Sequence, residues 1–340
     1  MFDLAGLHQA EAVVYGAMPP TPQYRWPGLS RLAGCDVWVK HENHTPTGAF
    51  KVRGGLVLFH ELHRTGQLPA KVITATRGNH GQSIPFAASR FGIPVTVLAP
   101  RGNSVEKNAA MVGWGAELVE FGDDFEDARV EAVRRAESEG ALLVPPFHPA
   151  LVRGVATYAL ELLTAVPDLD VVYVPIGMGS GICGLIRTRD LLGLKTDIVG
   201  VVAARAPAMA RSVAAGEVVA TQAADTFADG IACRVPMPEP LDVVCRGAAG
   251  VVEVGEDAIA EAMRMLYSET HNVAEGAGAA AFAALMQHRG RHAGQRVAVV
   301  LTGGNVDTAI LRIVLGGGVP VAETAVLQAA PSASGSPPRA

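Results

Sequence analysis

Short apolar runs alternate with longer amphipathic segments through most of the chain, and glycine-rich or polar turns separate the two. In the first stretch of this pattern the expected strands are residues 72–75, 95–98, 117–121 and 142–144, and the expected helices are residues 82–91, 105–114 and 125–140. A second alternation begins near Arg153, with strands expected near residues 171–175, 198–202, 251–254 and 297–301. Strands that alternate with helices are typical of parallel sheets joined by right-handed crossovers. The pattern therefore predicts an α/β fold with two doubly wound open-sheet domains and a cleft between them.

The break between the two alternations sets the expected domain boundaries. Residues 1–70 plus 150–325 form the predicted large domain, and residues 71–149 form the predicted small domain. A further strand is expected at residues 37–40, directly before a segment rich in threonine and glycine.

The two ends of the chain lack this alternation. Residues 1–27 include three prolines between positions 19 and 22, and the residue before a proline avoids the helical conformation. We therefore expect an extended lead-in there rather than a regular element. Residues 326–340 consist mostly of Ala, Ser, Pro and Gly, a composition that buries too little apolar surface to fold, so we expect a disordered tail.

Composition narrows the class of protein. The 340 residues are 49% hydrophobic and 18% charged, which is typical of a globular protein with room for two domains. The net charge is −5 and no basic run is present, so nucleic acids and anionic membranes are not expected partners. The four cysteines have no metal-ligand spacing, and so few cysteines in a chain of this length indicate a reducing compartment. Because there is also no secretory signal in residues 1–10 and no apolar run long enough for a membrane span, we expect a cytoplasmic protein.

Residues 45–55 contain a single lysine, Lys51, in a setting that favours nucleophilic chemistry. Ala49 and Phe50 precede it, and an apolar, helix-like run follows at residues 56–59. A lysine among apolar neighbours loses solvation, which favours the neutral amine and makes it a nucleophile toward carbonyl groups. Taken alone, the pattern is weak, because a lysine beside a phenylalanine is usually a surface residue whose stem lies on apolar neighbours.

Three further segments strengthen the case for a site, because each places glycine and small polar residues directly after a strand-like run. They are Thr-Arg-Gly-Asn-His-Gly-Gln at residues 76–82, Gly-Met-Gly-Ser-Gly at residues 177–181 and Thr-Gly-Gly-Asn at residues 302–305. Ligands of open α/β sheets collect where strands end and helices begin, and backbone N–H groups at helix N-termini bind anions. With Lys51, these turns predict one site gathered from distant parts of the sequence.

Together the four segments resemble fold type II of the pyridoxal-phosphate enzymes, the tryptophan-synthase-β-like group, and in particular its threonine/serine dehydratase and serine racemase branch. The resemblance runs from about Thr21 to Ile313, with all four motifs in the family's order. It implies pyridoxal 5′-phosphate bound in the cleft between the domains, an amino-acid substrate and a homodimer. A phenylserine-dehydratase-like member of this branch is one form that the protein could take.

The resemblance assigns cofactor-binding roles to residues of each motif. Lys51 matches the cofactor lysine, Phe50 matches a residue that packs near the cofactor, and Asn79 matches the asparagine that contacts the cofactor's 3-oxygen. Thr302 matches the residue that faces the pyridine nitrogen. A hydroxyl there donates to an unprotonated nitrogen, which suits elimination better than transamination. Ordinary packing for Phe50 and a strand end for Thr302 are the structural alternatives.

The segment at residues 177–181 matches the family's phosphate loop, which in many relatives is a run of four glycines. Met178 and Ser180 replace two of them here. The loop tolerates the replacement because a phosphate is held mainly by backbone N–H groups, and the Ser180 hydroxyl adds a donor. The alternative is a plain strand-to-helix turn. The residues assigned to the phosphate are Gly177, Met178, Gly179, Ser180 and Gly181.

The substrate is expected at the turn that holds Asn79. By the resemblance, Thr76, Arg77, Gly78, Asn79 and His80 would hold the substrate carboxylate, largely through backbone N–H groups. Glu275 matches a family glutamate near cofactor and substrate. It lies in an Ala/Gly-rich run, where burying a carboxylate without a partner is costly, although a carboxylate at a helix start is an alternative. Asp229 precedes a glycine, a pair that forms turns by itself, so we expect a structural role for it.

Three departures from the family pattern refine the expectation. Arg77 stands where serine racemases commonly carry a serine that acts as the second base, and a guanidinium does not exchange protons near neutral pH. Residues 203–208 contain no carboxylate, so no divalent metal is expected where part of the branch binds one, whereas a monovalent cation held by carbonyl oxygens would leave no such trace. Ala150 replaces a polar residue and would leave room for a larger β-substituent.

The resulting hypothesis is a pyridoxal-phosphate-dependent β-eliminating ammonia-lyase, with Lys51, Arg77 and Glu275 as candidate catalytic residues. Threonine and serine are the family's usual substrates. A phenyl ring could stack on Arg77 and a second carboxylate could bind its fork, and the apolar Ala150 ranks 3-phenylserine above 3-hydroxyaspartate. If Arg77 instead pairs with a structural acid, threonine stays preferred.

Several competing functions stay open at this point. An amino-acid racemase or a β-replacement synthase would share the cofactor. A non-catalytic metabolite-binding relative would need no Lys51, and a nicotinamide dehydrogenase would need an acidic ribose-binding residue, for which Asp197 is the one candidate.

Overall fold

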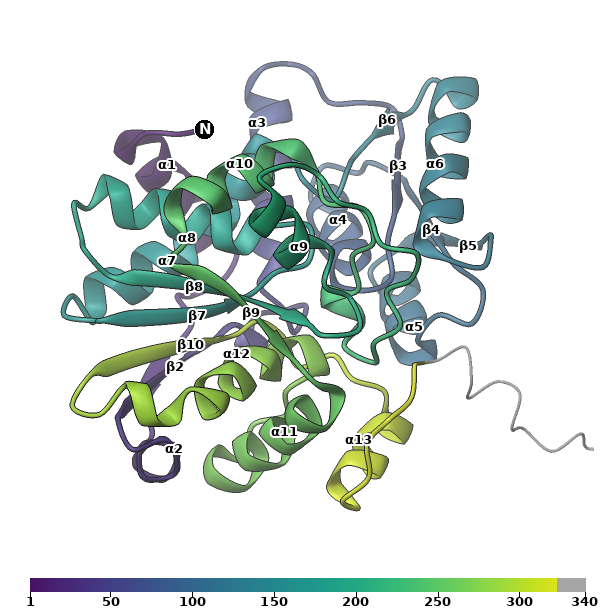
Figure 1. Cartoon of the computed structure of the whole chain (residues 1–340). Coiled ribbons are helices and arrows are strands. Elements are labelled where there is room, and N and C mark those ends of the chain that lie inside the picture. The colour runs from purple at the N-terminus through teal and green to yellow at the C-terminus, as the bar shows by residue number, and fades with distance from the viewer. Residues whose placement is uncertain (323–340) are drawn as a thin grey trace, which may run out of the picture.

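Two open sheets form the framework of the computed structural model, which describes residues 1–322 (Figure 1). The larger sheet has the strand order β1-β2-β10-β7-β8-β9. Its neighbouring strands run parallel, except for the antiparallel pair of β1 and β2 at one edge. The strands are β1 (Gln23–Arg25), β2 (Asp36–His41), β7 (Val171–Pro175), β8 (Asp197–Ala203), β9 (Gly250–Val254) and β10 (Arg296–Leu301).

The smaller sheet is wholly parallel and has the order β5-β4-β3-β6. Its strands are β3 (Val72–Ala75), β4 (Val95–Ala99), β5 (Ala116–Glu120) and β6 (Leu142–Leu143). All of them fall within the predicted small domain, although the domain boundaries themselves stay a prediction. We call the elements around this sheet the four-stranded unit and those around the larger sheet the six-stranded unit. The doubly wound α/β fold predicted from the hydrophobic pattern is confirmed.

Helices cover the sheets because their apolar faces need a partner. On one face of the larger sheet, α11 and α12 pack around the buried Leu266 and Phe282, and on the other face α7 and α8 pack around Leu162 and Val174 (Figure 1). The helices of the six-stranded unit are α1 (Leu4–Tyr15), α2 (Pro27–Ala33), α3 (Lys51–Arg64), α7 (Pro149–Ala165), α8 (Ser180–Leu191), α9 (Ala208–Ala215), α10 (Pro238–Gly247), α11 (Glu256–Thr270), α12 (Gly276–Gln287) and α13 (Thr308–Leu315). Three short 3₁₀ turns are η1 (Glu42–His44), η2 (Asp229–Ile231) and η3 (Arg289–Arg291).

In the four-stranded unit, α6 packs on Ile73 and Leu98, while α4 packs on the strands from the other side through Ile84. Its helices are α4 (Asn79–Ser89), α5 (Val105–Gly113) and α6 (Phe125–Glu139). The strands and helices predicted for residues 71–149 agree with these bounds to within three residues.

The N-terminal segment corrects one expectation, because residues 4–15 form a helix rather than an extended lead-in. The Asp3 side chain caps α1 by accepting a hydrogen bond from the Gly6 amide over 2.8 Å. Leu7, Ala10 and Val14 recur at helical spacing and are buried. The prolines at positions 19–22 end the segment but do not govern the residues before them. The tail predicted for residues 326–340 lies outside the described residues.

A fully buried ionic network lies directly beside Lys51 in the chain and fixes the helix that Lys51 begins. Arg53 donates from Nε to Glu42 Oε2 over 2.7 Å and from Nη1 to Glu161 Oε1 over 2.6 Å. Lys40 Nζ lies 2.5 Å from Glu161 Oε2. Two cations and two carboxylates therefore compensate each other inside the protein, and they join α3 to β2, η1 and α7.

None of the helices in the described part of the chain combines the length and the apolar character that crossing a membrane would require. The expectations of a homodimer and of a cytoplasmic location rest on the sequence alone.

Candidate active site

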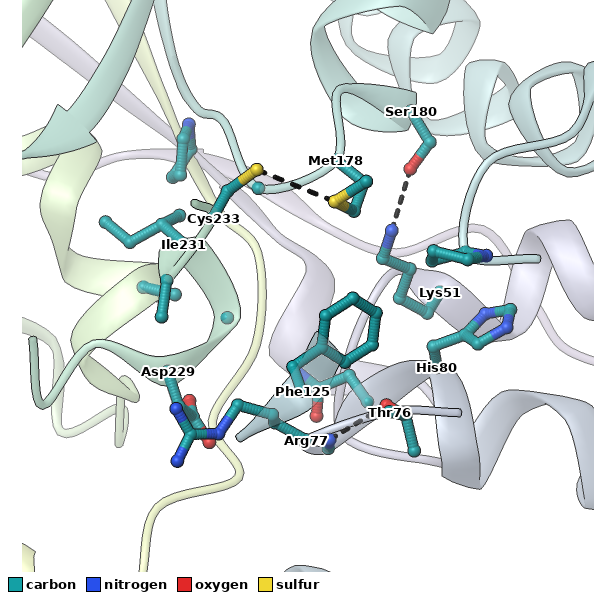
Figure 2. Close-up of a pocket in the computed structure, with 18 of the residues that line it drawn as sticks. Lys51, Thr76, Arg77, His80, Phe125, Met178, Ser180, Asp229, Ile231 and Cys233 are labelled. Carbon is teal, nitrogen blue, oxygen red and sulfur yellow. Dashed lines mark hydrogen bonds between the residues drawn. The ribbon is translucent and has the colours of Figure 1, made fainter. Parts of the chain in front are cut away.

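The four motifs meet at one cavity of about 120 Å³, which is lined by residues from both units (Figure 2). Three of them follow the carboxyl ends of β3, β7 and β10, and the fourth begins α3. An antiparallel bridge between Ala49 and Gly303 joins the lysine motif to the segment after β10. The predicted site residues in the cavity wall are Phe50, Lys51, Thr76, Arg77, Gly78, Asn79, His80, Gly177, Met178, Gly179, Ser180, Gly181, Glu275 and Thr302.

Lys51 faces this cavity with an amine that burial has made easier to deprotonate. Its Nζ donates a hydrogen bond to Ser180 Oγ over 2.8 Å and lies 5.0 Å from the centre of the Phe50 ring (Figure 2). Burial lowers the pKa of Lys51 to about 8, because the charged ammonium loses its hydration. The helix start is held in place by the Phe50 amide, which donates to the Thr302 carbonyl over 3.0 Å. Lys51 is therefore the first residue of a helix and also lines the cavity, whereas the sequence suggested a free turn.

The segment at residues 177–181 offers a set of unused donors at the start of α8. Within the part of the chain that the structure describes, its backbone N–H groups have no hydrogen-bond acceptor. Gly179 adopts φ +95°, a left-handed conformation that other residues rarely take. This conformation lets the amides that follow it, at the start of α8, face the cavity. Such a helix N-terminus attracts an anion through its N–H groups and its dipole.

The turn at residues 76–80 is a second group of free amides. Thr76 Oγ1 accepts from the Gly78 amide over 2.9 Å, which shapes the turn. Among the described residues, the N–H groups of Arg77, Asn79 and His80 have no acceptor. The His80 ring is buried against Thr74, and burial lowers its pKa to about 3, so the ring is neutral near pH 7. The turn can therefore hold a carboxylate without a charged histidine.

Glu275 and Asn79 come from different units and meet at the cavity wall. Asn79 Nδ2 donates to Glu275 Oε1 over 2.6 Å, and Asn79 Oδ1 accepts from Asn305 Nδ2 over 2.8 Å. Asn305 also donates to the Thr47 carbonyl over 2.7 Å. Glu275 is buried, which raises its pKa, while the nearby Lys107 ammonium acts in the opposite direction. Glu275, the carboxylate in the Ala/Gly-rich run, thus has partners in Asn79 and Lys107.

Arg77 forms no ion pair with any residue that the structure describes. Its side chain extends from the turn toward Asp229 and away from Lys51, and the Phe125 ring stands on the cavity side of it (Figure 2). Its Nε is buried without an acceptor. Arg77 therefore presents an uncompensated positive charge and a flat guanidinium at the outer part of the cavity.

Ala150 corrects another expectation, because it is absent from the cavity wall in the described structure. It is 4% exposed, at the start of α7, and belongs to the same apolar cluster as Leu56 and Leu151. A small residue there serves packing between helices, so no role in substrate binding follows from it.

Several residues of the cavity have no obvious signal in the sequence. Phe125 reads as an ordinary first residue of an amphipathic helix, and Cys233 lies in an irregular loop, where its Sγ is 3.6 Å from Met178 Sδ. Lys107 reads as a solvated lysine of a surface helix, yet it is buried and pairs with Asp229 and Glu275. The ionic partner also gives Asp229 more than the turn-forming role expected for it. Their positions follow only from how the two units face each other.

Comparison with known proteins places the whole site in context. A family model described as pyridoxal-phosphate dependent enzyme matches residues 14–303 of this chain. An L-threonine ammonia-lyase of Thermotoga maritima is 33% identical over 294 residues, which cover 86% of this chain and 72% of that protein. An L-threonine ammonia-lyase of Geobacter sulfurreducens is 36% identical over 288 residues, which cover 84% and 71%, respectively.

A solved structure of maize serine racemase has the same fold. It superposes with a TM-score of 0.85 at 26% sequence identity, and the match covers 93% of this chain and 97% of that one.

Proposed function

The chain belongs to the pyridoxal-phosphate dependent enzyme family, and from this premise we propose that it is an ammonia-lyase that eliminates the β-hydroxyl group of a β-hydroxy-α-amino acid. The amino acid loses water, and hydrolysis of the resulting product gives a 2-oxo acid and ammonia. The observation that supports this most directly is the cavity itself, where a readily deprotonated Lys51 faces two separate sets of free backbone N–H groups. Relatives named L-threonine ammonia-lyase support the same reaction.

The residues present fit the cofactor of this family. The free amides of residues 177–181 and the Ser180 hydroxyl would hold its phosphate, Lys51 would hold its aldehyde carbon, and Thr302 would face its ring nitrogen. The orphan donors are the decisive sign of fit, because buried backbone N–H groups are almost always paired. When bound, the cofactor supplies the electron sink that makes loss of a proton from the substrate α-carbon feasible.

The chain's own residues supply positioning and proton transfer. The amides of Arg77, Asn79 and His80 would hold the substrate carboxylate, which fixes the orientation of the α-carbon hydrogen. Lys51 Nζ is the base for that hydrogen, since its lowered pKa leaves a larger neutral fraction near neutral pH than a fully solvated lysine would have. Ser180 Oγ, 2.8 Å from Nζ, can keep the amine in place between proton transfers.

For the side chain of the substrate, we propose that the site accepts 3-phenylserine in addition to threonine and serine. The cavity wall includes the Phe125 ring, the sulfur atoms of Met178 and Cys233, and the Arg77 guanidinium (Figure 2). Aromatic rings pack favourably on rings, sulfur atoms and guanidinium groups. The Arg77 fork would alternatively bind the second carboxylate of 3-hydroxyaspartate. This substrate ranks lower because the carboxylates of Glu126 and Asp229 line the same cavity and would repel a second negative charge.

The resemblance to a serine racemase makes racemisation the second candidate. Arg77 disfavours it, because a guanidinium cannot serve as the second base on the opposite face of the substrate. Incubation of the full chain, loaded with pyridoxal phosphate, with L-threonine, L-serine, 3-phenylserine and 3-hydroxyaspartate tests the proposal. Equal amounts of ammonia and 2-oxo acid are expected. Inverted amino acid without ammonia would overturn the proposal in favour of a racemase.

A further inference from the structure

A second lysine of the cavity, Lys107, joins the two units through their charges. It lies in α5 of the four-stranded unit and is 5% exposed. Its Nζ pairs with Asp229 of η2 and lies 3.2 Å from Glu275 Oε2, at the start of α12. Both acids belong to the six-stranded unit. The Lys107 ammonium is therefore what the four-stranded unit contributes to a cluster of three charges, in which Lys107 and Glu275 are buried and Asp229 is partly buried.

The charge of Lys107 determines whether Glu275 can stay ionised. Glu275 is 2% exposed and faces a second carboxylate, Asp229, and both circumstances favour its protonated form. The charged groups that face Glu275 are Lys107 from α5 and Asp229 from η2, while Lys51 and Arg77 line the same cavity. Removal of the ammonium would leave two carboxylates together in a buried place, and the more deeply buried one would take up a proton.

The protonation state of Glu275 acts together with Asn305 to set which way the Asn79 amide points. An ionised carboxylate only accepts hydrogen bonds, so Asn79 must present Nδ2 to Glu275 and Oδ1 to Asn305, as the structure has it. A protonated Glu275 could donate to Asn79 Oδ1 in a flipped amide. That flip would turn Asn79 Nδ2 toward Asn305 Nδ2, so Asn305 would have to give up its bond to the Thr47 carbonyl as well. In the first orientation, the other Nδ2 hydrogen of Asn79 is available to the cavity. In the flipped orientation, that donor is lost.

We propose that Lys107 is a positioning residue that keeps Glu275 ionised and thereby fixes the amide of Asn79 as a donor toward the bound cofactor. The role belongs to the cofactor site and does not depend on which amino acid is the substrate. Lys107 also supports the fold, which is a separate role. Its stem packs closely on the turn, because a Cβ at Gly78 would lie only 2.9 Å from Lys107 Cδ. The side-chain stem therefore supports the turn, whereas the ammonium sets the amide.

The test compares the affinity of the full chain for pyridoxal phosphate, measured by absorbance titration after removal of the cofactor, between pH 6.5 and pH 9. Lys107→Met keeps an apolar stem but removes the charge, and we expect about tenfold weaker binding than in the wild type at pH 7. The deficit should shrink as the pH is raised toward 9, because a higher pH favours the ionised form of Glu275 even without the ammonium. Titration of Lys51 occurs in both proteins, so it cancels in the ratio.

Two further proteins separate charge from support. Asp307→Asn removes an ionised acceptor for Ser104 Oγ, 2.5 Å away at the cap of the same helix, and leaves the Lys107 cluster intact. It should change affinity by less than about twofold, since it weakens docking of α5 alone. In a Glu275→Gln background, Lys107→Met should add less than about twofold, because no carboxylate remains to be ionised at position 275.

Equal affinity of wild type and Lys107→Met would overturn the proposal, as would a deficit that stays constant with pH. An equal loss in Asp307→Asn would also overturn it, since domain docking would then explain the effect. If Lys107→Met alone does not fold, the pair in the Glu275→Gln background decides. A further loss of tenfold there would show a role other than control of Glu275.

Discussion

Lys51 Nζ donates a hydrogen bond to Ser180 Oγ over 2.8 Å, so the proposed base contacts the first residue of the helix that would hold the cofactor phosphate. The two residues are 129 positions apart in the sequence. Their contact places the Lys51 amine beside the loop that would hold the cofactor phosphate. Lys51 is therefore the most informative residue to change.

Lys51→Ala should lower the rate of ammonia release by at least about 10³-fold, because it removes both the attachment point and the base. Circular dichroism and thermal unfolding should show a folded protein, since the change deletes a poorly solvated amine rather than a packing group. Ser138→Ala, on the exposed side of α6, is the matched control and should have normal activity. Near-normal ammonia release by the Lys51 variant would refute the assignment.

The rate at which the cofactor-free protein captures pyridoxal phosphate should depend on pH through Lys51. Burial lowers the pKa of this amine from 10.5 to about 8, so it is mostly protonated and unreactive below that pH and mostly neutral above it. Stopped-flow absorbance should therefore show a capture rate that rises through about pH 8 and levels off well below pH 10.5. A midpoint near 10.5 would mean that the amine is fully solvated.

Arg77→Ala should change selectivity rather than activity in general. If the guanidinium face packs on a phenyl ring, kcat/KM for 3-phenylserine should fall by about 2- to 30-fold, in line with about 0.5–2 kcal/mol for such contacts, while that for threonine changes little. A selective loss for 3-hydroxyaspartate would instead identify Arg77 as a carboxylate ligand. Equal losses for all three substrates would show that it serves the common part of the substrate or the cofactor.

Removal of divalent metal ions should leave the activity unchanged. The residues after β8, at positions 203–208, include no carboxylate, and Arg205 pairs with Asp225 at the surface nearby. Hard divalent cations need several oxygen ligands, most often carboxylates. Assays after dialysis against a chelator test this directly, and a full loss of activity that magnesium restores would contradict it.

The buried network beside the lysine helix should matter for stability. Arg53→Met leaves Glu42 and Glu161 without their main partner, and breaking a buried pair in this way costs about 3–5 kcal/mol of unfolding free energy. The matched control is Arg246→Met, which removes an exposed pair with Asp242 and should cost less than about 1 kcal/mol. Urea unfolding of the two variants measures the difference, and equal costs would mean that the buried charges contribute little.

The parts of the site made by backbone were readable from the sequence, because strand, glycine turn and helix follow each other along the chain. Lys51, the turn at residues 76–80 and the loop at residues 177–181 are of this kind. Lys107 and Phe125 were not, since a lysine in an amphipathic helix carries no mark of the carboxylates that meet it from another unit. Ala150 failed for the opposite reason: its place in the sequence suggested the cavity, whereas α7 turns it into the core.

The fold shows the same division. Every strand predicted from period and composition is present to within about a residue, whereas α1 was obscured by prolines that lie after it. The strands could be predicted because their signals are local in the sequence. Helix α1 could not, because it is stabilised by the packing of Leu7 and Val14 against other helices.

The free amides at residues 177–181 have a consequence for how this protein can diverge. Because the proposed anion site consists of peptide groups held by one left-handed glycine, the neighbouring positions 178 and 180 can change their side chains without dismantling it. Position 77 has the same freedom, since its amide serves the turn while its side chain points outward. New preferences could therefore arise through single substitutions at these three positions. Gly179 would have to be retained for its left-handed conformation, and Gly177 because a Cβ there would lie 2.4 Å from the Gly230 carbonyl oxygen.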